Sequence, residues 1–105
     1  MSTEPLHVQT ARALRWTEIE NKDGSWWGTE PHGHLAMAIP HYDRSWCSAG
    51  ALVNRYHIGL MWDHGQWVAQ HSDPEGRDAY QGGESPTEAV CRLVVTLAKE
   101  SRLKE

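Results

Sequence analysis

Large apolar residues occupy every second position from Ile58 to Trp62, which is the period of a half-buried strand. Residues 66–71 return with the same period. Between them, Gly65 supplies the positive φ that a three-residue hairpin loop needs. The pattern predicts an antiparallel hairpin over Ile58–His71.

Two helical patterns flank this hairpin. After a turn at residues 41–43, apolar residues recur at helical spacing from Trp46 to Tyr56, and the candidate caps are Asp43 and Ser45. Beyond the hairpin, Ser85 and Glu88 form a capping box around Pro86. The second helix has a broad apolar face made of Ala89, Val90, Leu93, Val94 and Leu97.

The remaining segments predict shorter elements. Thr3 is the expected cap of an N-terminal helix, and residues 21–24 have the composition of a turn. Three short strands are expected at Ser25–Thr29, Leu35–Ile39 and Asp78–Gln81. The chain is therefore predicted to be of the α+β class, a small antiparallel sheet with helices packed on it.

Size and charge narrow the function classes. The 105 residues suit one domain, 1–105, and the net charge is −4 with 10 basic and 14 acidic side chains. The basic residues form no block that could follow a phosphate backbone, so direct nucleic-acid binding is not expected. No apolar run approaches 18 residues, so we expect a cytoplasmic protein without a membrane partner.

The two cysteines, Cys47 and Cys91, both fall within predicted helices. Their separation of 44 residues excludes a compact thiol motif, and we expect two reduced thiols in the core.

Several segments resemble small phage proteins. They are the turn at Tyr42, residues 51–60, Gly65-Gln66-Trp67 and residues 85–92, together with an N-terminal pattern of Val8, Ala11, Leu14 and Trp16. Together they resemble the phage ABA-sandwich domain family and the NinX-like proteins of lambdoid phages, over most of the chain apart from about residues 25–38. The resemblance implies a three-layer α/β/α sandwich encoded by a phage or prophage, and it brings no catalytic residues.

Histidines raise the question of a metal. His32-Gly33-His34, with His41 nearby, could offer two or three imidazoles from one loop. The HxH pattern is common, however, and no cysteine or carboxylate stands at a characteristic spacing from it. We therefore predict no metal and no other cofactor.

Catalytic patterns are also weak. His64 or His71 could pair with Asp63 or Asp73, but a hairpin tip is usually exposed, and turn formation explains Asp63 fully. No nucleophile elbow surrounds Cys47. We predict no catalytic residues and a non-enzymatic protein.

The candidate binding residues are Trp26, Trp27, His32 and His34. Adjacent strand residues point to opposite faces, so one indole can be core while the other contacts a partner beside the two histidines. A helical layer on each face would instead bury both indoles. The two alternatives stay open.

The leading functional hypothesis is an accessory protein of a phage that binds and inhibits a host protein complex, for example as an anti-CRISPR inhibitor. The alternative is a small-ligand binder, or sponge, that sequesters a nucleotide signal through tryptophan stacking and arginines. A homodimer is also compatible with a small sheet that has open edges.

Overall fold

The computed structural model describes residues 4–103. In chain order the elements are α1 (Leu6–Ala13), β1 (Thr17–Lys22), β2 (Ser25–Thr29), β3 (Met37–Ala38), α2 (Trp46–Tyr56), β4 (Gly59–Asp63), β5 (Gln66–Ser72), β6 (Asp78–Gly83) and α3 (Pro86–Lys99).

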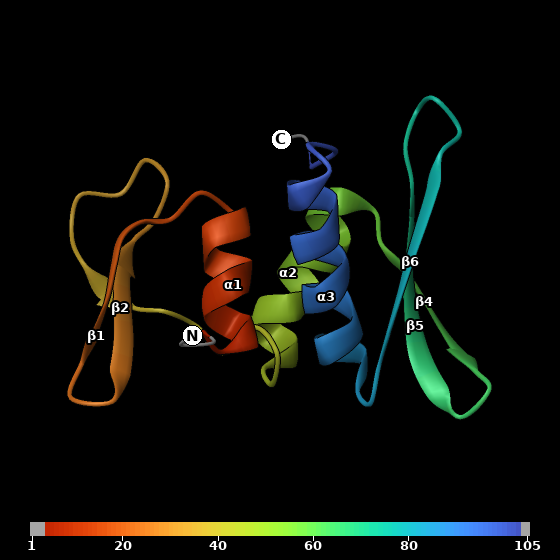
Figure 1. The fold of residues 1–105 in the computed structure, drawn as a ribbon. Coiled ribbons are helices and arrows are strands. Elements are labelled where there is room, and N and C mark those ends of the chain that lie inside the picture. Colours follow the sequence, from red (N-terminus) through yellow and green to blue (C-terminus); the bar gives the residue numbers. More distant parts are fainter. Residues whose placement is uncertain (1–3, 104–105) are drawn as a thin grey trace.

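Helices form the middle layer, and a three-stranded antiparallel sheet lies on each side of them (Figure 1). The first sheet has the order β1-β2-β3 and the second β4-β5-β6. The predicted α+β class, with antiparallel strands and helices packed on them, is confirmed. The layers run sheet, helices, sheet, so they differ from the single central sheet that an α/β/α sandwich implies. The physical reason is that β1, β2 and β3, which precede α2, pair only with one another, and β4, β5 and β6, which follow α2, do the same.

The second sheet contains the predicted hairpin, but its loop has two residues, His64 and Gly65, because Asp63 pairs with Gln66. Leu60 pairs with Ala69 and Trp62 with Trp67, and β6 continues the ladder on the other side of β5. Small residues on the inner face let α3 approach: Ala69 and Ala79 are buried, and so is Gly83. This sheet therefore packs directly on α3 (Figure 1).

The first sheet contains a strand that the sequence pattern did not predict. β1 pairs with β2 across a tight turn in which Asp23 and Gly24 both have positive φ and Asn21 Oδ1 accepts from the Gly24 amide at 3.0 Å. Five of the six β1 residues are exposed, so no alternation marks the strand. The strand expected at Leu35–Ile39 contracts to the two residues of β3.

The start of α2 has one of its two candidate caps. Ser45, not Asp43, caps this helix, accepting from the Ser48 amide at 3.4 Å. α2 ends at His57, which takes the left-handed conformation (φ 53°). The ring Nδ1 of His71 lies 2.9 Å from the Tyr56 carbonyl oxygen and so joins the end of α2 to β5.

The core is built around α3, whose start at Ser85-Pro86 is confirmed. The predicted capping box is only half formed, because the Glu88 carboxylate pairs with Arg92 at 2.7 Å. Ser85 accepts from the Glu88 amide at 3.1 Å, and Pro86 occupies the first helical turn. Cys91 is fully buried here, but Cys47 is exposed, so the prediction of two core thiols is wrong for Cys47. Both thiols are free. The main buried apolar residues are Val8, Ala11, Leu14, Trp16, Ile39, Leu52, Tyr56, Ile58, Val90, Leu93, Val94 and Leu97.

Pro5 precedes the first residue of α1. The predicted cap, Thr3, lies outside the described residues. Within residues 4–103, no helix has the length and apolar character needed to cross a membrane.

Candidate functional site

The two adjacent tryptophans of β2 are both half-buried. Trp26 packs against the helical core, and because neighbouring strand residues alternate, Trp27 faces away from it. The structure thus lies between the two alternatives left open by the sequence, since neither indole is fully enclosed and neither is fully free.

The loop histidines do not join Trp26 in one surface. His32 is exposed in a left-handed conformation (φ 68°) and lines a pocket beside α2. Trp26 lines a different pocket, between α1 and the first sheet, together with His7 and His41. His34 is exposed on the loop. Trp26 and His32 therefore lie in different pockets.

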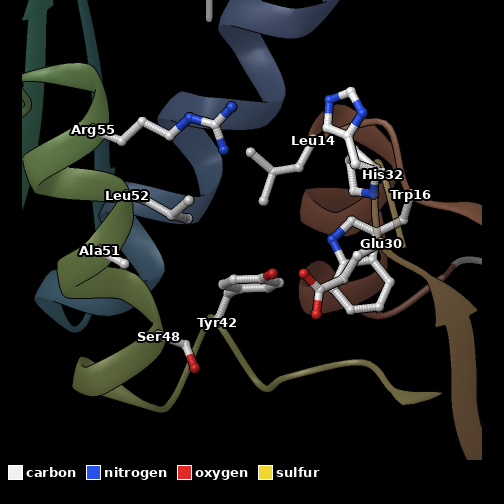
Figure 2. A pocket seen from close by; sticks show the side chains of 10 residues that line it. Leu14, Trp16, Glu30, His32, Tyr42, Ser48, Ala51, Leu52 and Arg55 are labelled. Atoms are coloured by element: carbon white, nitrogen blue, oxygen red, sulfur yellow. The ribbon is translucent and has the colours of Figure 1, made fainter. Parts of the chain in front are cut away.

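The pocket beside α2 is shown in Figure 2 and has a volume of about 240 Å³. Leu14, Trp16 and Leu52 supply apolar walls, Arg55 reaches in from α2, and the Tyr42 side chain points across the floor toward Glu30. Burial raises the pKa of Tyr42, so its hydroxyl stays protonated at neutral pH.

This pocket is small for a nucleotide. Sites that enclose drug-sized ligands commonly measure about 300–1,000 Å³. The Arg55 guanidinium is also engaged with the fold, lying 5.2 Å from the centroid of the Tyr56 ring. The geometry therefore suits a compact polar molecule better than a base and its phosphates.

A third surface is the face of the β4–β6 sheet that points away from α3. By strand parity it carries Met61, Val68 and Tyr80, with Met61 directly opposite Val68. Met61 is 43% exposed and Tyr80 52%. We call these three residues, with their polar neighbours Gln66 and Gln70, the outer sheet face.

The outer sheet face is not among the binding residues predicted from the sequence, because that prediction rested on the adjacent tryptophans of β2 and the loop histidines. The available signal was apolar residues at the positions that should be polar: Met61 alternates with the inward Leu60, and Val68 with the inward Ala69. Trp62 lies on the inward side near the hairpin end, and its ring meets that of Trp67 edge-on with 5.6 Å between the ring centroids. It is still 61% exposed.

The hairpin groups considered for catalysis have structural partners. His64 Nδ1 lies 2.7 Å from an Asp63 oxygen at the exposed tip. Asp73 accepts from the Arg77 side chain at 2.8 Å and from two backbone amides. These bonds, the Arg77 backbone amide first, lower the pKa of the Asp73 carboxyl, which stays ionised as a loop anchor.

Comparison with protein-family models finds none that matches this chain. Comparison with curated proteins likewise finds no match.

Proposed function

We propose that this chain is a small non-enzymatic accessory protein of a phage that binds and inhibits a host protein complex, as an anti-CRISPR inhibitor would. The phage context is supported by the resemblance of the Tyr42 turn and of residues 51–60, 65–67 and 85–92 to small phage proteins. The mode of action, binding through a surface, is supported by the outer sheet face.

The outer sheet face is the observation that carries this proposal. α3 covers the inner side of the sheet, and among residues 4–103 no element covers the outer side (Figure 1). Contiguous exposed apolar groups of this kind mark interaction sites, and Tyr and Met are enriched at the centres of interfaces. Met61 and Tyr80 are therefore the expected anchors.

Charge indicates the kind of partner. The three strands contain no lysine or arginine, and Asp63 and Asp78 stand at opposite corners of the outer sheet face. An apolar centre with an acidic margin complements an apolar groove with a basic rim. Basic surfaces are typical of complexes that handle nucleic acid, which favours such a complex as the host target.

The test uses a double variant, Met61→Glu with Tyr80→Glu. Leu35→Glu is the matched control, because Leu35 is 82% exposed and lies in the segment before β3, away from this sheet. Each protein is expressed in bacteria that carry a CRISPR system targeting a test phage, and plating efficiency is measured. We expect the wild type and the control to restore plating and the double variant to fail.

Binding is measured in parallel with the purified host complex. Loss of two anchors should weaken it by at least about 30-fold, or 2 kcal/mol. An unimpaired double variant would exclude the outer sheet face, and a wild type without effect on any tested defence system would exclude the inhibitor role. Conversion of a dimer to a monomer by the double variant would assign this face to a second copy of the chain.

The small-ligand alternative receives less support. The pocket of Figure 2 is below the usual ligand range, and its arginine already contacts the Tyr56 ring.

A further inference from the structure

Three ionisable side chains from separate parts of the sequence meet between α1 and the first sheet. His7 comes from the first turn of α1, and His41 and Asp43 come from the turn before α2. Their nitrogen and oxygen ligand atoms all lie within 4.8 Å of one another. The two imidazole rings are 4.3 Å apart between centroids and tilted by 39°.

Two of these side chains each have a buried atom without a hydrogen-bond partner. His7 is only 5% exposed, and no described group bonds its buried Nδ1. The buried Oδ1 of Asp43 likewise has no hydrogen-bond partner among residues 4–103. Buried polar atoms are nearly always bonded, so a pair of exceptions facing one cluster indicates an additional binding group.

The fold does not explain the Asp43 carboxylate. Ser45 caps α2 in its place. The Thr87 hydroxyl donates to the backbone oxygen of Asp43 at 2.7 Å and not to its carboxylate. The amides of Arg44 and Ser45 donate to the His41 carbonyl at 2.9 and 2.8 Å. The turn is thus fixed through its backbone, which leaves the side chains of His41 and Asp43 available.

We propose that His7, His41 and Asp43 bind a divalent transition-metal ion, and that Zn²⁺ is a suitable ion. Two imidazoles and one carboxylate form a donor set that favours zinc and its neighbours over magnesium or calcium, which prefer oxygen. Both imidazoles must be neutral to ligate the ion.

The distances permit this site with a small adjustment. Bonds of 2.0–2.2 Å around a tetrahedral ion place ligand atoms about 3.4 Å apart. His41 is exposed, so its ring can turn inward while His7 and Asp43 stay in place. Solvent also reaches the cluster on the His41 side.

Three protein ligands leave one coordination position open. The adjoining cavity of about 290 Å³ is lined by Trp26, Arg44 and Ile39 as well as by the two histidines. Water or a small anion could occupy the fourth position, and the Arg44 guanidinium would favour an anion there.

The experiment uses the full chain after treatment with a chelator and its removal. Zn²⁺ is titrated by calorimetry, and Co²⁺ is added separately as a spectroscopic probe. We expect one Zn²⁺ per chain, a raised melting temperature, and the visible absorption of Co²⁺ in a low-coordinate site with nitrogen ligands.

His41→Ala is the main variant because His41 is exposed and its loss should not unfold the chain. We expect at least a tenfold loss of Zn²⁺ affinity, and a similar loss for Asp43→Asn, which keeps shape and removes charge. His34→Ala is the matched control, an exposed histidine of the preceding loop that should leave affinity unchanged.

Absence of stoichiometric Zn²⁺ binding to the wild type would overturn the proposal, as would equal losses in His41→Ala and His34→Ala. The outer sheet face lies on the other side of the helical layer, so a failure here leaves the inhibitor proposal intact (Figure 1).

Discussion

Cys47 and Cys91 lie in α2 and α3, yet their thiols have opposite surroundings. Cys91 is fully buried among the apolar residues of the core, whereas Cys47 is exposed in the first turn of α2. The pKa of the Cys91 thiol is raised to about 12, mainly by its burial. Since the thiolate is the reactive form, only Cys47 should react in the folded protein.

We predict that a thiol reagent at pH 8 modifies one cysteine per native chain and two after denaturation. Mass spectrometry of the labelled peptides should place the native label on Cys47, and Cys47→Ser should abolish it. Two labels on the native protein would show that the core opens readily at Cys91.

The surroundings of the two cysteines follow only in part from the sequence. The helical positions of both cysteines follow from the sequence pattern, but the side of α2 that meets solvent depends on which neighbours arrive from elsewhere. His32 and Trp26 illustrate the same limit: their types suggested binding, yet tertiary packing puts them in separate pockets.

At the scale of elements, the contact between β6 and α3 depends on a glycine. A Cβ built on Gly83 would lie 2.7 Å from the Ala89 backbone nitrogen, and this backbone cannot move aside without shifting α3. On Gly59, at the edge strand β4, a Cβ would meet only the Gln70 carbonyl oxygen at 4.0 Å. The two glycines form a matched pair.

Gly83→Ala should therefore destabilise the protein by roughly 2–3 kcal/mol, because overpacking forces the sheet away from the helix. Gly59→Ala should change stability by less than about 0.5 kcal/mol. Urea unfolding followed by circular dichroism measures both, and equal effects would refute the close approach at Gly83.

The helix caps give a second prediction. The Glu88 amide donates to Ser85 at 3.1 Å, whereas the Ser48 amide donates to Ser45 at 3.4 Å. We expect Ser85→Ala to cost about 1 kcal/mol and Ser45→Ala roughly half as much. Guanidinium unfolding of the two variants tests this order, and a larger loss for Ser45→Ala would contradict it.

Caps and hairpins were also the most predictable elements. Ser85-Pro86 and the turn at Gly65 carry local signals that do not depend on the rest of the fold. β1 has no such signal, since its exposed residues lack alternation. For the cap of α2, Asp43 and Ser45 both satisfy the local rule, and only packing decides between them.

At the scale of the whole molecule, the two sheets are attached to the helices unequally. β5 and β6 pack closely on α3, whereas the first sheet is joined to the core mainly through Trp16, Ile19 and Trp26. No sequence pattern indicated that the strands form two groups, because alternation shows which face of a strand is buried but not which strands share a sheet.

We predict that the backbone amides of β1 and β2 exchange with deuterium at least about tenfold faster than those of β5. Both groups are hydrogen-bonded within their sheets, so the difference would report packing on the helices. Hydrogen-exchange mass spectrometry resolves the two regions. Equal protection would show that both sheets open only with the whole fold.

The central position of α3 has a consequence for synthesis in the cell. α1, α2, β5 and β6 all pack on α3, and all of them precede it in the chain. Until residues 86–99 have left the ribosome, these elements have no surface on which to bury their apolar sides. The fold should therefore close in one late step, after residues 86–99 have emerged.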